Sequence, residues 1–342
     1  MQPTTIAVDL AKSVFEVAVS QRPGRVASRH RLSRRGFARF LREQEPATLV
    51  MEACGTAHYW AREARARGHQ VRLLPPRDVS RYRRGNKTDR NDAKAILEAD
   101  RNEDLHSVAI KSVDQQALVG LHRLRSAWVS TRTARINTLR GLLRELGETI
   151  PTGARNVIPH VHALLADEKL PPTLRPVLAG ATEEIRDLEH RIKEVEAQLE
   201  AMARESELIR RLRTIPGIGL LTATAIPATL DLPSYPSGRH FASSLGITPR
   251  EASSGQTRRL GRITKRGDPY LRTLLIHGAR SVLHHAKRRK DPDRLQSWAL
   301  ERERTRGHNK AAVAVANKLA RIVWAVGVRD AAYQPTPSAS DH

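Results

Sequence analysis

The stretch TTIAVDLAKSVFEVAVS, residues 4–20, has the period and the β-branched content of two strands, TTIAVDL and SVFEVAVS, separated by a short turn. The first of these strands contains Asp9 among apolar residues. Burying an isolated carboxylate is unfavourable unless it is paired or bound to a metal ion. The stretch therefore predicts the start of a sheet. It also predicts that the carboxylate of Asp9 is paired or bound to a metal ion, since its burial would otherwise be unfavourable.

The rest of the first hundred residues alternates between strand-like and helix-like segments. The predicted strands are RVASRHRL, TLVMEAC and QVRLLPP, and the predicted helices are RRGFARFLREQ, TAHYWAREARARG and TDRNDAKAILEADR. The order is βββαβαβα, in which an antiparallel meander precedes βα units. This order predicts an α/β domain with a mixed sheet and helices on its faces, as in ribonuclease-H-like folds.

The second part of the chain is predicted to be helical. A long helix is expected from about Ser112 to Leu146, and residues 182–204 repeat apolar residues at alternating steps of three and four over three heptads. The residues of this seam are Ile185, Leu188, Ile192, Val195, Leu199 and Met202. A seam of this kind closes either within a chain or between chains, and we expect it to favour a homo-oligomer, a dimer or a tetramer.

These patterns divide the chain into four segments. We expect the mixed-sheet domain at residues 1–110, a helical coiled-coil region at 111–205, a mostly helical domain at 206–330 and a disordered tail at 331–342. In the third segment a loop rich in Pro, Ser and Gly leads into two helices, at about 268–287 and 308–327. The predicted class is therefore α/β followed by α.

The chain is strongly basic. It has 59 Lys and Arg against 36 Asp and Glu, which gives a formal net charge of +23. This balance predicts a polyanionic partner, with the backbone of a nucleic acid ahead of a merely solvated basic surface. Aromatic residues make up 4% of the chain, which does not suggest a base-stacking platform.

No membrane or export segment is expected. The first residues lack the basic and apolar regions of a signal peptide. The apolar run at 311–328 is interrupted by Asn317, Lys318 and Arg321, which argues against a membrane span. The single cysteine, Cys54, excludes an intrachain disulfide and a thiolate zinc site, and it fits a reducing cytoplasm.

Four acidic residues stand out in the first domain: Asp9, Glu52 at the end of LVMEAC, and Asp89 and Asp92 at the start of the last helix. In a ribonuclease-H-like sheet the first and fourth strands are neighbours, and the following helix can bring its first turn toward their ends. Four converging carboxylates repel one another unless divalent cations neutralise them. Mg²⁺, or Mn²⁺ in its place, takes oxygen ligands, and two such ions about 4 Å apart stabilise both oxygens of a phosphoryl displacement. We therefore predict a metal-dependent, nuclease-like centre.

Each of these acids also has a purely structural explanation. Asp89 can be a helix N-cap and Asp92 an acid favoured by the helix dipole, each worth about 1 kcal/mol. Glu52 can lie at the surface, and Asp9 can be satisfied by backbone amides. The stretch VDLAKSVFEVAV is also compatible with the first phosphate loop of actin-like kinases and ATPases, but the segments after residues 52 and 75 lack the further glycine-rich loops of that family.

The third segment begins with TIPGIGLLTATAI, where Gly217 and Gly219 form a turn before a helix. Such glycines let backbone N–H groups approach a phosphate, as in helix-hairpin-helix modules, but they equally make a tight packing turn. Between Thr257 and Lys290 there are eleven Lys and Arg against one acid, Asp268. Salt-sensitive phosphate contact is expected in this region.

Within this basic region, Ser253 and Ser254 precede Gly255 in a loop flanked by arginines. A serine held by guanidinium groups beside a phosphodiester can act as a nucleophile, although the sequence ASSG is more often an ordinary loop. The residues expected to contact nucleic acid are Lys87, Arg90, Gly217, Gly219, Arg250, Arg258, Arg259, Lys265, Arg266 and Arg272.

Taken together, the motifs resemble those of the DEDD transposases of bacterial insertion sequences, the group described as bridge-RNA-guided recombinases. The resemblance covers residues 4 to 328 and is carried, in order, by VDLAKSVFEV, VMEACGTAHYW, GNKTDRNDAKAI, QQALVGLHRLR, TIPGIGLLTA, FASSLGITPREASSG, RITKRGDPYLRTLLIHGAR and NKAAVAVANKLARIVWAV. It implies a RuvC-like first domain, a helical coiled-coil insert, a C-terminal transposase domain and a place in the bacterial cytoplasm.

The resemblance also implies the chemistry. By motif position, the metal-binding acids are Asp9, Glu52, Asp89 and Asp92, and the nucleophile is Ser253, with Ser254 one residue away. In such transposases each centre is thought to combine the acids of one subunit with the serine of another. The serine is expected to form a phosphoserine link before strand exchange through a Holliday junction, while a noncoding guide RNA pairs with donor and target DNA.

Two other functions would use the same residues. A metal-dependent nuclease or junction resolvase would hydrolyse DNA with water and the four acids, without the serine. An inactive copy would bind nucleic acid only, but the presence of all four acids argues against it.

Overall fold

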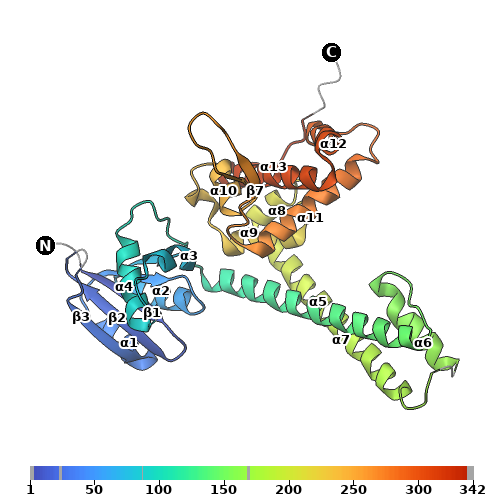
Figure 1. Cartoon of the computed structure of the whole chain (residues 1–342), viewed down its shortest axis with the longest axis horizontal. Helices are drawn as coiled ribbons and strands as arrows, with labels where there is room; N and C mark the ends of the chain where they lie inside the picture. The colour runs from blue at the N-terminus through green and yellow to red at the C-terminus, as the bar shows by residue number, and fades with distance from the viewer. Residues whose placement is uncertain (1–3, 23–24, 87, 168–169, 337–342) are drawn as a thin grey trace. The chain divides into compact units, whose positions relative to one another are not determined.

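The computed structural model describes residues 4–22, 25–86, 88–167 and 170–336 (Figure 1). The chain divides into two compact units, Met1–Asp114 and Gln115–His342.

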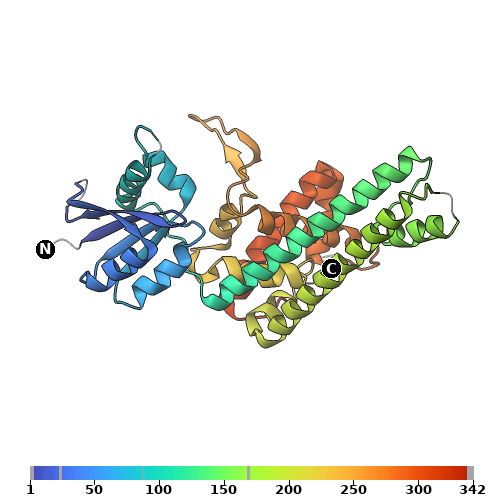
Figure 2. The same cartoon turned by 90° about the horizontal axis from the view of Figure 1, so that it is seen from below.

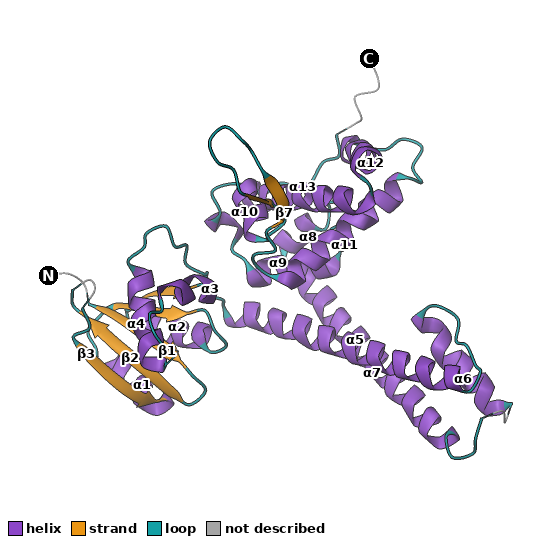
Figure 3. Cartoon of the chain, viewed as in Figure 1, coloured by secondary structure: helices purple, strands orange, loops and turns teal. Residues whose placement is uncertain are grey.

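The first unit is built on a five-stranded sheet, drawn in orange in Figure 3. Its strands are β1 (Thr5–Leu10), β2 (Val14–Ser20), β3 (Ser28–Ser33), β4 (Thr48–Glu52) and β5 (Gln70–Leu74), and their spatial order is β3-β2-β1-β4-β5. The first three strands are antiparallel, whereas β4 runs parallel to β1 and β5 parallel to β4. The predicted mixed sheet is confirmed, with the first and fourth strands as neighbours at its centre.

Helices cover both faces of this sheet, as the edge-on view in Figure 2 shows. On one face α1 (Arg34–Glu43) and α2 (Ala57–Arg65) pack against side chains such as Val8, and on the other α4 (Asp89–Asp100) packs against side chains such as Ala7. The chain reaches α4 through the short α3 (Pro76–Val79) and a 3₁₀ turn at Ser80–Tyr82, neither of which was predicted. The described fold is thus α/β, as the βββαβαβα order predicted.

The second unit begins with two long helices that pair along their length. They are α5, which starts at the unit boundary (Val113–Glu145), and α7 (Arg175–Glu205), with α6 (Val157–Ala166) between them in sequence. Antiparallel pairing is marked by the ion pairs Arg125–Glu196, Arg132–Glu189 and Arg135–Glu184. Seam residues such as Ile185 and Leu199 are buried in clusters that also contain residues of α5. The predicted seam therefore closes within the chain, and it carries no argument for a homo-oligomer.

The remaining helices form one core around α11 and α13. In order they are α8 (Glu207–Leu212), α9 (Leu220–Thr229), α10 (Gly238–Ser244), α11 (Pro269–Ala286), α12 (Arg294–Arg306) and α13 (His308–Arg329), with a 3₁₀ turn at Leu232–Ser234. Among the described residues α13 is long and apolar enough to cross a membrane by length and composition. Its apolar side, including Leu319 and Val323, is fully buried in this core, which is the role of a core helix.

Part of the segment predicted as a tail packs on this core. Tyr333 packs against it and donates its backbone N–H to Thr214 Oγ1 at 2.9 Å. The Arg294 N–H donates to the Thr336 carbonyl at 3.0 Å. Residues 337–342 of the predicted tail lie outside the described residues.

Candidate functional site

The four predicted acids occupy three elements of the first unit. Because side chains alternate across a strand, Asp9 lies on the same face as Ala7, and Glu52 on the same face as Val50, and both of these apolar residues pack with α4. Asp89 is the first residue of α4. Its N-cap is Thr88, whose hydroxyl accepts the Asn91 N–H at 3.3 Å. The explanation of Asp89 as an N-cap is therefore wrong.

The structure brings the other three carboxylates within electrostatic reach of Asp9. Burial raises the pKa of Asp9 from 3.8 to about 6, and the carboxylates of Asp92, Asp89 and Glu52 raise it further in that order of importance, followed by Glu16 on β2. One acid in a group can be perturbed in this way only when the others lie near it. A divalent cation would relieve this repulsion, and carboxylate oxygens are the donors that Mg²⁺ prefers.

The carboxylates that act on Asp9 are not arranged with it as a ligand sphere. Among the described residues, no three or more His, Cys, Asp or Glu side chains come close enough together to hold one metal ion. Asp92 instead makes an ion pair with Arg83, with Nη1 and Oδ1 at 3.1 Å. Arg83 precedes α4 and was not predicted, because nothing in the RYRRGNK run distinguishes it from its basic neighbours. By charge and donor type, Asp9, Glu52, Asp89 and Asp92 fit a divalent cation, with Arg83 as the competing cation.

Two basic residues near α4 were predicted to contact nucleic acid. Arg90 is exposed in the first turn of α4, and its backbone carbonyl accepts a hydrogen bond from Arg29 Nη1 of β3 at 3.1 Å. Lys87 lies outside the described residues. The side chain of Arg90 is thus available at the surface beside the acids.

The predicted nucleophile lies on a β-hairpin of the second unit. The strands β6 (Pro249–Glu251) and β7 (Leu260–Ile263) pair antiparallel and extend into a long loop, visible beside the β7 label in Figure 1. An isolated bridge between Ser254 and Thr257 closes the tip of this loop. The hairpin is exposed along most of its length. Backbone hydrogen bonds, rather than a core, therefore hold it in this form.

The hydroxyl of Ser253 is fixed by two hydrogen bonds. It donates to Glu251 Oε1 at 2.7 Å, and it accepts the backbone N–H of Arg259 at 3.1 Å. Glu251 also pairs with Arg258, with Nε and Oε1 at 3.4 Å. A serine hydroxyl that donates to a carboxylate has the arrangement of a nucleophile with its base. Glu251 was missed by the sequence analysis, although it stands two residues before Ser253 in PREASSG.

The basic residues predicted around this loop divide into two groups. Exposed side chains at or near the hairpin are those of Arg250, Arg258, Arg259, Lys265 and Arg266. Arg272 on α11 is half-buried and donates from Nη1 to the carbonyl oxygens of Leu245 and Arg266, each at 3.1 Å. Its guanidinium therefore holds the base of the hairpin in this structure, whereas the other five side chains are exposed, Arg258 while paired with Glu251.

The two predicted phosphate-binding glycines have different surroundings. Gly217 has a positive φ of 80°, and a Cβ there would lie 2.5 Å from the Gly278 carbonyl oxygen of α11. Gly219 is the N-cap of α9, and a Cβ there would meet nothing within 4 Å. Gly217 therefore serves a close backbone approach between the turn and α11, which was the alternative explanation for this motif.

This difference predicts a matched pair of stability effects. Gly217→Ala should lower the free energy of unfolding of the helical unit by about 2–4 kcal/mol, because the new Cβ meets backbone in a left-handed conformation. Gly219→Ala should change it by less than about 1 kcal/mol. Urea unfolding followed by circular dichroism measures both. Equal effects would contradict the packing role of Gly217.

Comparisons with known proteins place both units in one family. Residues 209–298 match the model of the "Transposase IS116/IS110/IS902 family", and residues 6–147 match a transposase model of DEDD type for IS110 elements. The first match includes the serine hairpin, and the second includes all four acids.

Full-length relatives agree with these matches. A "Probable family 20 transposase" of Pseudomonas aeruginosa is 42% identical over 98% of this chain and 100% of its own length. The "Transposase for insertion sequence element IS1111A" of Coxiella burnetii is 37% identical over 96% of this chain and 91% of its own. A similar transposase of the element IS1328 from Yersinia enterocolitica is 37% identical over 94% of this chain and 96% of its own. The two family matches and the similarity over nearly the whole chain show that this chain belongs to the IS110 family of insertion-sequence transposases.

Proposed function

We propose that this transposase cuts and exchanges DNA strands through a covalent phosphoserine intermediate on Ser253. The observation that carries the proposal is the 2.7 Å hydrogen bond from Ser253 Oγ to the Glu251 carboxylate, on an exposed hairpin rich in arginine. In the step proposed, Oγ forms a bond to phosphorus and its proton passes to Glu251. The bond from phosphorus to one DNA oxygen breaks, and this oxygen leaves as the strand end and takes up a proton. Arg258 and Arg259 stabilise the charge on the phosphate.

The four acids supply the second part of the proposed centre. Asp9, Glu52, Asp89 and Asp92 would hold a divalent cation, Mg²⁺ or Mn²⁺, which supplies electrostatic stabilisation of the phosphate when bound. The raised pKa of Asp9, caused by burial and by the other carboxylates, supports a cation at this place. Following the family resemblance, we propose that a dimer or tetramer combines the acids of one subunit with the serine of another. Exchange would then pass through a Holliday junction.

The product of cleavage tests this mechanism. Wild-type protein together with the RNA that co-purifies with it, incubated with Mg²⁺ and labelled DNA carrying the ends of its element, should give protein–DNA adducts that survive denaturation with detergent. Free 5′-phosphate ends without adducts would contradict the proposal and favour the second candidate, a metal-dependent nuclease or junction resolvase that uses water. That candidate is supported by the same four acids.

The guide is a separate part of the proposal. The resemblance implies a noncoding bridge RNA that pairs with donor and target DNA, and the net charge of +23 supports such a polyanionic partner. Sequencing the RNA that co-purifies with the protein should give one noncoding species from the DNA that flanks the gene. A random mixture of RNA would contradict guidance without affecting the serine mechanism.

Glu251→Gln should slow adduct formation by a factor of about 10² or more, because glutamine keeps a hydrogen-bond acceptor for Ser253 but cannot take its proton. Single-turnover assays with labelled DNA measure the rate. Affinity for the same DNA should not fall, since the change removes a negative charge. A rate within about twofold of the wild type would show that Glu251 is not the base.

A further inference from the structure

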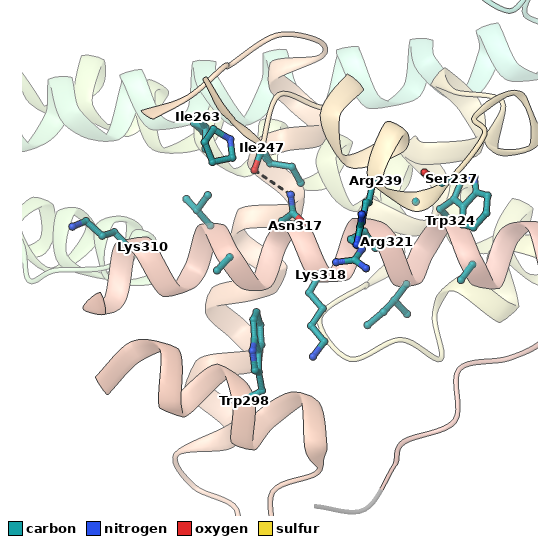
Figure 4. Close-up of a pocket in the computed structure, with 16 residues that line it drawn as sticks. Ser237, Arg239, Ile247, Ile263, Trp298, Lys310, Asn317, Lys318, Arg321 and Trp324 are labelled. Atoms are coloured by element: carbon teal, nitrogen blue, oxygen red, sulfur yellow. Dashed lines mark hydrogen bonds between the residues drawn. The ribbon is translucent and has the colours of Figure 1, made fainter. Parts of the chain in front are cut away.

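The second unit contains a groove along α13, on the side of this helix that faces away from the core (Figure 4). Its volume is about 1200 Å³. The floor contains the small apolar residues Val313, Ala314 and Ala325 of α13, and the walls come from α10, α12 and the start of β6. Ligand pockets usually have volumes of about 300–1000 Å³, so the groove is large enough for an extended ligand.

The charge of this groove is entirely positive. Arg239, Lys310, Lys318 and Arg321 line it, and no acid is among its described lining residues. Figure 4 shows Arg239 from α10 and Arg321 from α13 reaching the same part of the groove. Gly238 allows this close approach, because a Cβ there would lie 3.1 Å from the Arg321 backbone. The fold thus holds these two guanidinium groups in the same part of the groove.

Lys318 is placed by an aromatic ring. Its Nζ lies 4.3 Å from the centre of the Trp298 ring, and the Arg302 guanidinium lies 5.7 Å from the same ring. Burial lowers the pKa of Lys318, and the charges of Arg294, Arg321 and Arg302 lower it further, against the smaller opposite effect of Asp293. Cations that crowd one another in this way gain free energy when an anion binds between them.

We propose that this groove binds a strand of nucleic acid, with backbone phosphates on Lys318 and Arg321 and the sugars and bases against the apolar floor and Trp298. A single small anion would need neither the length of the groove nor its apolar floor, whereas an unpaired strand offers phosphates and flat apolar surfaces in alternation. The site is distinct from Ser253 and from the four acids. It rests on the proposed function, because a strand-exchanging transposase exposes unpaired strands.

Binding without cleavage tests the groove. The full chain with Ser253→Ala, in EDTA, is titrated against fluorescent single-stranded DNA and against RNA of the same sequence, over a series of salt concentrations. Adding Lys318→Gln and Arg321→Gln should weaken binding about tenfold at physiological salt and lower the slope of log K against log salt by about 1.4, the value for two lost phosphate contacts. If affinity falls for both DNA and RNA, the groove recognises the phosphates that they share. If affinity falls for only one of them, the groove recognises that nucleic acid.

A matched variant distinguishes the loss of contacts in the groove from the loss of overall positive charge. Arg191→Gln with Lys193→Gln removes the same two charges from exposed positions of α7 and should lower affinity much less. Circular dichroism confirms that both variants are folded. As a second readout, bound strand should protect Lys318, but not Lys193, from acetylation followed by mass spectrometry. Equal losses in the two variants, or unchanged acetylation of Lys318, would overturn the groove. Failure of the Ser253→Ala chain with an intact groove to bind either strand would also overturn the groove, whereas the adduct assay tests the proposed function separately.

Discussion

Ser253→Ala should abolish covalent protein–DNA adducts while leaving affinity for DNA within about twofold of the wild type. The substitution removes only the hydroxyl group, whose oxygen is held in this structure between Glu251 and the Arg259 N–H. A lost nucleophile costs a factor of about 10⁶ in enzymes that form covalent intermediates, so no adduct should be detectable. Denaturing gels of labelled DNA measure adducts, and fluorescence anisotropy measures affinity.

Ser254→Ala is the control, because it removes the same group one position away. The backbone N–H and carbonyl of Ser254 pair with Thr257 at 3.2 and 3.1 Å, and both hydrogen bonds survive this substitution. Adduct formation should therefore continue. Adducts with Ser253→Ala but not with Ser254→Ala would move the nucleophile by one residue, and adducts with both would contradict the phosphoserine mechanism.

The sheet and its long helices were predictable because their patterns are local. The apolar runs of β1 and β4 and the heptads of α7 carry their own period. The helix α12 was missed because its sequence, RLQSWALERERTR, buries few side chains and shows no apolar stripe. Its signal was the capping box of Asp293 and Gln296, which the structure shows in both directions. The exposed hairpin of β6 and β7 carries no alternating pattern at all.

The acids were predictable for a different reason than their partners. Asp9 and Glu52 lie two residues beyond Ala7 and Val50, so strand alternation alone puts them on the side of α4. Arg83 and Glu251 were missed because their roles depend on the path of the loop before α4 and of the β6–β7 hairpin, respectively. Gly217 shows the opposite case, since its contact with Gly278 joins positions 61 residues apart and only the folded chain reveals it. Local periodicity therefore finds the strands, the long helices and the acids, whereas the partners of Asp92 and Ser253 depend on loop and hairpin geometry that has no period.

Asp9→Asn should abolish strand cleavage and, without metal, make the folded protein more stable. Burial and the neighbouring carboxylates raise the pKa of Asp9 from 3.8 to about 6, so the charged form is disfavoured in the folded state. The full shift corresponds to about 3 kcal/mol at 1.36 kcal/mol per pKa unit. Because Asp9 is partly exposed, solvent screening reduces the expected gain to about 1–2 kcal/mol. Cleavage assays and urea unfolding at pH 7 in EDTA measure the two effects.

The stability gained by Asp9→Asn should depend on pH. A carboxyl group with a raised pKa binds its proton more tightly in the folded protein than in the unfolded chain. Ionised Asp9 therefore lowers the free energy of unfolding by its full amount above pH 6, and this loss disappears as the pH falls below 3.8. The difference in stability between Asp9→Asn and the wild type should therefore be largest at pH 7, shrink as the pH falls through 6 and vanish below 3.8. Millimolar Mg²⁺ should stabilise the wild type more than the variant, because binding to the folded state adds to stability.

Glu16→Gln is the matched control for Asp9→Asn. Glu16 faces Asp9 across the β1–β2 pair and makes the smallest of the contributions to its pKa. The control should remain active and gain less stability, because it removes a neighbouring charge but keeps all four proposed ligands. Equal stability of Asp9→Asn and the wild type at pH 7 would mean that neither burial nor the neighbouring carboxylates disfavour the charged form of Asp9. Continued cleavage by Asp9→Asn would remove Asp9 from the centre, since an amide cannot replace a charged ligand of Mg²⁺ at the same strength.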